Sequence, residues 1–274
     1  MRLVIPRKFF ITGADGASNA IDPVLIPPLS EQHRKLALSG LAPAPAQAEG
    51  DQAHLAIIGF AKDGSAFAFE QFGFRNNHTF PFSELSVIET DTGKFFAGMP
   101  FQSAIAVRGA VLQSARRMTY AAARSVLNQR AIKEPGVVAG RATGDPNDPA
   151  AQSLSFEMPT LGPVMVKIEA TAVKSVGCEA ADVKIKALAL RLVDGKDALI
   201  RNLFLEKSPP PDRLCPTGYG LAEVRYFPRK DKPPILAVVI GFDRPALGGL
   251  DRRYMGVTVD LATPAEPVKE DSHH

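Results

Sequence analysis

The stretch from His54 to Gly98 decides the fold, and it reads HLAIIGFAKDGSAFAFEQFGFRNNHTFPFSELSVIETDTGKFFAG. It holds nine of the chain's 16 phenylalanines. Lys62-Asp63-Gly64-Ser65 and Asp91-Thr92-Gly93 are turn signals, because glycine adopts positive φ without steric cost and aspartate bonds the turn backbone. Apolar residues recur between these turns, which predicts four strands, at residues 55–60, 65–72, 84–89 and 94–97.

The second half of the chain repeats this β pattern. Seven further strands are predicted, at residues 154–158, 164–173, 184–193, 198–205, 220–227, 236–242 and 254–260. The Asp194-Gly195 pair between two of them is a hairpin signal. We therefore predict a mainly β protein whose antiparallel sheets pack as a sandwich-like or partial-propeller body.

A single amphipathic helix interrupts the strands. It is predicted to begin at Gln113 or Ser114, with Ser114 as its cap, and to end near Arg130, before the helix-breaking pair Pro135-Gly136. The apolar stripe expected to face the core is spaced by four residues at Met118, Ala122 and Val126, and Ala115 and Leu127 extend it. The arginines assigned to the solvated sides of the helix are Arg116, Arg117 and Arg124.

Composition narrows the class of protein. The chain has 274 residues, a hydrophobic share of 45% and a charged share of 22%, which are ordinary values for a globular protein. The formal net charge of +3 is small and no block of Lys and Arg stands out, so we predict no nucleic-acid binding. No apolar run approaches the roughly 18 residues that a spanning helix needs, so no membrane span is expected.

The domain organisation follows from the placement of turn residues and polar residues. We predict one β-rich domain over residues 49–262, with a candidate sub-boundary in the Pro- and Asp-rich stretch 140–151. Residues 1–48 are predicted to be an extended or signal-like segment outside the fold, and residues 263–274 a flexible tail. Asp145, Asn147 and Asp148 suggest calcium ligands, but the Gly and the later Glu of an EF-hand loop are missing. We interpret this stretch as a turn.

The N-terminal segment contains a candidate export signal. The basic triplet His33-Arg34-Lys35 precedes the short apolar stretch 36–45, and Ala46-Gln47-Ala48 follows in the position of a cleavage site. Cleavage there would start the mature chain near Glu49. The alternative is an extended Ala/Pro linker.

The two cysteines bear on the same question. Cys178 and Cys215 lack the spacing of a zinc site, which leaves buried free thiols or a disulfide. An exported protein favours the disulfide, so we predict the pair to be bridged and the protein to be periplasmic or secreted.

Three blocks of residues carry a family resemblance. The first block is Gly59-Phe60, Asp63-Gly64, Phe67-Ala68-Phe69-Glu70, Gly73 and Phe80-Pro81-Phe82-Ser83. The other two are Arg213-Leu214-Cys215-Pro216 with Tyr219, and Gly241-Phe242 with Asp251-Arg252-Arg253-Tyr254 and Val257-Thr258. Over roughly residues 54–260 they resemble a bacterial family of predicted secreted proteins of unknown function. The resemblance implies an N-terminal secretion signal and supplies no activity.

A second resemblance, to one blade of a TolB-type β-propeller, is carried by residues 58–64, Phe67-Ala68-Phe69 and a strand that ends at Asp91-Thr92-Gly93. A propeller needs at least four such units, and the sequence shows one. Within the secreted family, the chain departs at Ala61-Lys62, where Ser-Pro is common, and by an insert at residues 246–249.

The sequence contains no G-x-S-x-G, H-E-x-x-H, P-loop or G-x-G-x-x-G motif, so we assign no catalytic residue, cofactor or metal. Glu70 lies among phenylalanines, and if buried it must pair or raise its pKa. Arg252 or Arg253 is the expected partner. We favour a structural or exposed role for Glu70. The alternative is a hydrolase that uses Glu70 with Asp91 or Asp251 as an acid/base pair.

The leading functional hypothesis is a non-enzymatic periplasmic or envelope module that binds an envelope protein or a small ligand. Its surface is predicted to combine the loop 75–82 with the turn 251–253, since loops carried on a rigid sheet are frequent binding sites. The candidate binding residues are Glu70, Arg75, Asn76, His78, Asp251, Arg252 and Arg253. The sequence indicates neither the identity of the partner nor an oligomeric state.

Overall fold

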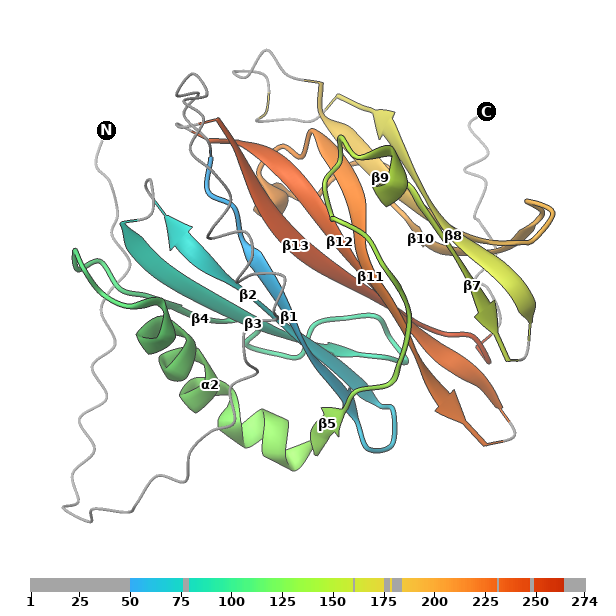
Figure 1. Cartoon of the computed structure of the whole chain (residues 1–274), viewed down its shortest axis with the longest axis horizontal. Helices are drawn as coiled ribbons and strands as arrows, with labels where there is room; N and C mark the ends of the chain where they lie inside the picture. Colours follow the sequence, from blue (N-terminus) through green and yellow to red (C-terminus); the bar gives the residue numbers. More distant parts are fainter. Residues whose placement is uncertain are drawn as a thin grey trace, which may run out of the picture.

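A computed structural model describes residues 50–75, 79–159, 161–174, 178, 184–230, 232–246 and 249–263. Within these residues the chain forms three antiparallel sheets and one α-helix, as Figure 1 shows, and the predicted mainly β class is confirmed. Residues 1–48, and most of the predicted tail, lie outside the described residues. The structure therefore bears on neither the candidate export signal nor that tail.

The first sheet, which we call the helix-side sheet, has the strand order β4-β3-β2-β1-β5. Its strands are β1 (His54–Ala61), β2 (Ala66–Arg75), β3 (Phe80–Glu89), β4 (Phe101–Ala104) and β5 (Ile132–Glu134). It packs against both the helix and a second sheet, and so does not form an isolated four-stranded propeller blade. The strand predicted at 94–97 is wrong. Only Phe95 bridges to Ile88, because Gly93 and Gly98 turn the chain on either side.

The helix α2 (Leu112–Gln129) covers the outer face of this sheet and packs mainly on β3 and β4. The helix itself is confirmed, but the predicted stripe is only partly right: Ala115 is buried and Val126 and Leu127 pack on the core, whereas Met118 is 54% exposed and Ala122 is exposed. The buried residues are Ala115, Arg116, Thr119, Tyr120 and Ala123. The helix is rotated so that Arg116 reaches Glu70 in the sheet. Ser114 is not the cap, since Val111 occupies that position without a side-chain bond.

The central sheet has the order β13-β12-β11-β6 and is covered on both faces. Its strands are β6 (Val137–Arg141), β11 (Gly218–Arg229), β12 (Lys232–Ala246) and β13 (Gly249–Asp260). Because neighbouring strand residues face opposite sides, Ile235, Ala237 and Val239 pack with Phe60, Phe67 and Phe69 of the helix-side sheet. Leu236, Val238 and Ile240 face the third sheet. An uninterrupted apolar run is what such a doubly covered strand requires.

The outer sheet has the order β10-β9-β8-β7 and closes the other side of the central sheet. Its strands are β7 (Ser153–Met158), β8 (Gly162–Ala172), β9 (Lys186–Asp194) and β10 (Leu199–Leu205). Short 3₁₀ turns, η1 (Pro149–Ala151) and η2 (Pro211–Arg213), precede β7 and β11. From left to right, Figure 1 thus shows helix, helix-side sheet, central sheet and outer sheet as successive layers.

The cysteines lie at one end of the outer sheet. Cys178 and Cys215 form a disulfide with their Cα atoms 5.6 Å apart, which confirms the predicted bridge. It ties the connection between β8 and β9 to the segment that follows η2. Beside it, Arg213 donates to Glu206 Oε2 at 2.7 Å, and the Tyr219 hydroxyl donates to Glu206 Oε1 at 3.0 Å. This end of the molecule is therefore held by covalent and polar links together.

Candidate functional site

Three segments meet at the ring of Phe82 in β3. The guanidinium carbon of Arg75, the last residue of β2, lies 5.0 Å from the ring centroid, and that of Arg253 in β13 lies 4.9 Å from it. Ser83, the next residue, points toward α2, so Phe82 faces the opposite side of the sheet. Arg75 and Phe82 from the first segment named from the sequence, and Arg253 from the second, therefore come together at one place.

Arg253 is the buried anchor of this surface, with 6% of the residue exposed. Its Nη2 lies 3.2 Å from Asp251 Oδ2 and 3.7 Å from Asp51 Oδ2. Its Nη1 donates to the backbone oxygens of Asp51 and Arg252 at 2.9 and 2.8 Å. The segment before β1 pairs with β13 through a bridge between Gln52 and Arg252. This pairing places Asp51 next to Arg253 and so helps to hold the Arg253 side chain in position.

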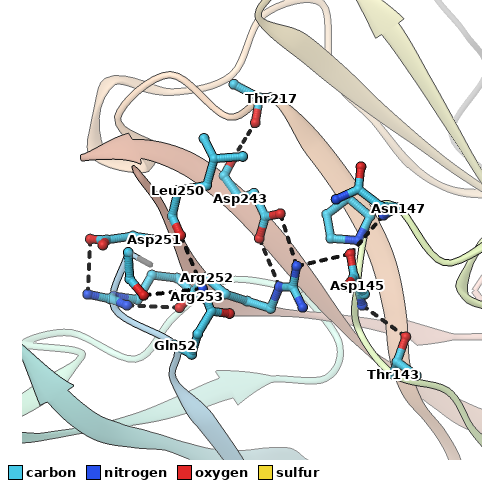
Figure 2. A network of polar contacts seen from close by, with 12 residues as sticks. Gln52, Thr143, Asp145, Asn147, Thr217, Asp243, Leu250, Asp251, Arg252 and Arg253 are labelled. Carbon is cyan, nitrogen blue, oxygen red and sulfur yellow. Dashed lines mark hydrogen bonds and ion pairs between the residues drawn. The ribbon is translucent and has the colours of Figure 1, made fainter. Parts of the chain in front are cut away.

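Arg252 points to the other side of β13, as the alternation of strand residues requires. Figure 2 shows its guanidinium between two aspartates. It donates to Asp243 at 2.8 and 3.0 Å and lies 3.0 Å from Asp145 Oδ1. Burial alone would lower the pKa of Arg252, but Asp243 and Asp145 hold it above its ordinary value. Both aspartates already neutralise this arginine.

Two glycines bring Asp145 to that position. Gly220 and Gly241 are cross-strand partners in β11 and β12. A Cβ on Gly241 would lie 2.2 Å from the Gly144 oxygen, and one on Gly220 would lie 2.6 Å from the Asp145 oxygen. Only glycines allow the 144–145 loop to lie directly on the sheet. The Asp145 side chain, which accepts from the Asn147 amide at 2.8 Å, then reaches Arg252.

Two further charged groups complete the surface around Phe82. Arg244 in β12 lies 3.6 Å from Asp251 Oδ2. Glu84 in β3 accepts from Gln71 Nε2 at 2.9 Å. Burial raises the pKa of Glu84, although Gln71 and the nearby arginines Arg253, Arg75 and Arg244 act in the opposite direction. Burial also lowers the pKa of Arg253, and Arg244 and Arg75 add to that effect against the pull of Asp251.

Glu70 belongs to a different cluster, sealed between α2 and the helix-side sheet. It is fully buried, and its carboxylate takes 2.7 and 2.9 Å bonds from Arg116 and a 2.9 Å bond from Ser83. The expected partner, Arg252 or Arg253, is therefore wrong, because those arginines lie on the other side of the sheet. Arg116 also stacks on Phe72, 3.9 Å from the ring centroid. Burial raises the pKa of the neighbouring Tyr120 hydroxyl.

The comparison with family models covers most of this architecture. Residues 68–260 match the model of a family described as predicted secreted protein (DUF2259). The chain belongs to this family. The family assignment confirms the predicted resemblance and places the protein outside the cytoplasm, as expected from the candidate signal and the disulfide. No curated protein and no solved structure matches the chain.

The family match spans β2 through β13 and therefore includes the whole Phe82 surface except the entering segment before β1. Of the residues predicted from the sequence, Arg75, Asp251 and Arg253 come together there, and Arg252 lies on the reverse side of β13. Asn76 and His78 fall outside the described residues. Glu70 is separate from this surface.

Sequence reasoning missed Arg244 and Glu84, which complete the cluster. Arg244 faces Asp251 directly across the β12–β13 hairpin, and Glu84 faces Gln71 across β2 and β3. Strand register would have revealed both pairs.

Two further properties concern the described part of the chain. It contains no group of three or more His, Cys, Asp or Glu side chains placed to hold a metal ion. Within the same residues, no helix is long and apolar enough to cross a membrane.

Proposed function

We propose that this exported protein is a non-enzymatic binding module of the periplasm or envelope, and that it recognises an anionic group at the Phe82 surface. The observation that carries the proposal is the convergence of Arg75 and Arg253 on one phenylalanine ring from segments 178 residues apart in the chain. A rigid three-sheet body holds these side chains at its edge. That is the usual construction of a binding surface.

The charges around Phe82 favour an anionic partner. Arg75 is exposed, and no carboxylate of the described residues forms an ion pair with it. Arg244 has only the 3.6 Å contact with Asp251, which Arg253 also uses at 3.2 Å. Arg244 and Arg253 thus share Asp251, and Arg253 also lies 3.7 Å from Asp51 Oδ2, while Arg75 has no ion pair among the described residues. A carboxylate or phosphate placed among them would relieve this repulsion through bidentate hydrogen bonds.

Site-specific crosslinking in the cell envelope of the native host tests the proposal. A photoreactive benzoylphenylalanine replaces Thr79, which lies half-buried beside Arg75 in the β2–β3 hairpin. The control position is Leu161, which is 42% exposed in the turn between β7 and β8, at the far side of the outer sheet. We expect a discrete adduct from position 79 and none from position 161.

The identity of the adduct, read by mass spectrometry, then shows whether the partner is a protein or a small molecule. Equal adducts from both positions would indicate random collision and would overturn the proposal. The absence of any adduct from position 79, with the protein folded and exported, would overturn it as well.

A further inference from the structure

Charge is distributed unevenly along this chain. Residues 92–133 contain seven Lys and Arg residues and no Asp or Glu. The whole chain carries +3, so the remainder has a net charge of −4, the difference between +3 and +7. The basic residues are spaced widely in this segment, which is why no block of them stands out. A cationic stretch of this length on an otherwise slightly acidic protein is a candidate interaction surface.

The fold gathers this segment into one layer. It forms β4, the loop after it, α2 and the start of β5, and so covers the outer face of the helix-side sheet (Figure 1). Only Arg116 turns inward, to Glu70. Arg108, Arg117 and Arg124 are exposed, and none of them forms an ion pair with a carboxylate among the described residues. The positive charge of this layer is therefore directed to solvent.

The exposed side of α2 is itself divided into two stripes. Arg117 and Arg124, seven residues apart, lie along one edge of it. Met118 and Ala122, four residues apart, lie along the other edge, and Val111 precedes the helix at its N-cap. Val111 and Met118 are 61% and 54% exposed, and Val107 in the preceding loop is 62% exposed. Exposed apolar side chains and exposed arginines without an ion pair among the described residues therefore lie on the same outer side of this layer.

We propose that this basic face, defined by Val107, Arg108, Val111, Arg117, Met118 and Arg124, docks on an anionic phospholipid surface. Phospholipid headgroups supply phosphates for the arginines, and the adjoining acyl region accepts Val111 and Met118. A free inorganic anion would match the charge alone and leave the apolar side chains without a partner. The face lies on the opposite side of the helix-side sheet from Phe82, so the membrane contact would leave the binding surface open.

Vesicle sedimentation of the full mature chain tests the electrostatic part. We expect binding to vesicles of phosphatidylcholine with phosphatidylglycerol, and none to phosphatidylcholine alone. The double variant Arg117→Gln/Arg124→Gln should weaken the partition coefficient at low ionic strength by about thirtyfold, the effect of losing two basic contacts. Lys196→Gln/Lys230→Gln removes the same charge from exposed turns elsewhere and should bind as the wild type does. Added salt should weaken binding, since it screens the arginines.

A fluorescence measurement tests the apolar part independently. The chain contains no Trp, so a single Met118→Trp substitution places one reporter on the face. Its emission should shift to the blue on addition of the anionic vesicles. Leu199→Trp, at a residue 53% exposed in β10, should show no shift. Circular dichroism confirms that each variant is folded.

Three results would overturn the proposal. They are equal binding to neutral and anionic vesicles, no binding to either, and equal loss in the Arg117/Arg124 and Lys196/Lys230 double variants. If the true partner of this face is an acidic protein, the protein should bind neither kind of vesicle. Because the crosslinking test at position 79 uses the other face of the sheet, either proposal can fail without the other.

Discussion

Two arginine–phenylalanine stacks lie on opposite faces of the helix-side sheet. Arg116 stacks on Phe72 under α2, and Arg75 stacks on Phe82 on the reverse face. Both rings are buried, with 2% and 1% of the residue exposed. The difference is in the arginines: Arg116 is 3% exposed and bonded to Glu70, whereas Arg75 is exposed and unpaired among the described residues.

Under the proposed function, this contrast separates a structural use of arginine, at Arg116, from a binding use, at Arg75. A buried guanidinium must have its charge and hydrogen bonds satisfied within the protein, and Glu70 does this for Arg116. An exposed guanidinium over an aromatic ring keeps its donors available to a partner. The two stacks therefore predict opposite outcomes: loss of the first should harm folding and loss of the second should harm binding.

The largest expected effect is on stability, from Arg116→Met. Removing Arg116 leaves the Glu70 carboxylate buried and unpaired, which should cost about 3–5 kcal/mol of the free energy of unfolding. Urea denaturation measures this change. The double variant Glu70→Leu/Arg116→Met should recover much of the loss, because it removes both charges. A single-variant loss below about 1 kcal/mol would show that this pair is not the structural element described above.

The second effect concerns the ring that supports Arg75 and Arg253. A Cβ on Gly73 would lie 3.0 Å from the Gln52 oxygen and 3.3 Å from Phe82 Cε1. Gly73→Ala should therefore displace the Phe82 ring or the entering strand and cost about 1–2 kcal/mol. Denaturation measures the cost, and the adduct yield from position 79 should fall with it. If Gly73→Ala is destabilised but the adduct yield from position 79 is unchanged, the position of the Phe82 ring does not matter for binding.

The sequence predicted the backbone of this molecule better than its side-chain partners. Asp-Gly turns and apolar alternation act locally, so ten of the eleven predicted strands match strands of the structure within a few residues. The failed one, at 94–97, lies between two positive-φ glycines. The disulfide was predicted from the candidate export signal, because the cysteine spacing alone left buried free thiols as an alternative. The strand at 236–242 was predicted without its burial on both faces.

Side-chain pairing depends on how the layers are stacked, which no local pattern specifies. Glu70 was singled out as a carboxylate that must find a partner if it is buried. Its partner is Arg116 on the helix, which the spacing of Met118, Ala122 and Val126 had assigned to a solvated side. The face of the helix that is buried includes Arg116, which pairs with Glu70. The sequence identified the two segments that contribute to the Phe82 surface. It did not show that Arg75 and Arg253 both stack on the Phe82 ring, because that contact depends on how the strands are arranged in space.

A smaller and pH-dependent effect is expected at Glu84. Burial raises its pKa above the ordinary value of 4.5, so the ionised form costs the folded state free energy. The contribution of Glu84 to stability is therefore fully present below the ordinary pKa and is lost as pH rises through the folded pKa. Glu84→Gln is uncharged throughout and should gain stability relative to the wild type over that window.

Urea denaturation of the two proteins from pH 4 to pH 7 measures this difference. The side chains that face Glu84 are Gln71, Arg75, Arg244 and Arg253, so no second carboxyl or imidazole group stands among them. The contrary result would be a wild type that becomes more stable than Glu84→Gln as pH rises. The attraction of the three arginines for the Glu84 carboxylate would then exceed the cost of burying it. In that case the Phe82 surface would already be neutral, and it would not need an anionic partner.

The smallest effect on stability, and the most informative one for function, is expected from Arg75→Gln. Arg75 has no ion pair among the described residues to lose, so its free energy of unfolding should change by less than about 1 kcal/mol, the range of an exposed cation–π contact. The adduct at position 79 should nevertheless disappear, because the removed guanidinium is the exposed part of the anion site. Lys230→Gln, an exposed charge removed from the β11–β12 turn, should leave the adduct intact. A stable Arg75→Gln protein with full crosslinking would place the partner elsewhere, and the two arginine stacks would then both be structural.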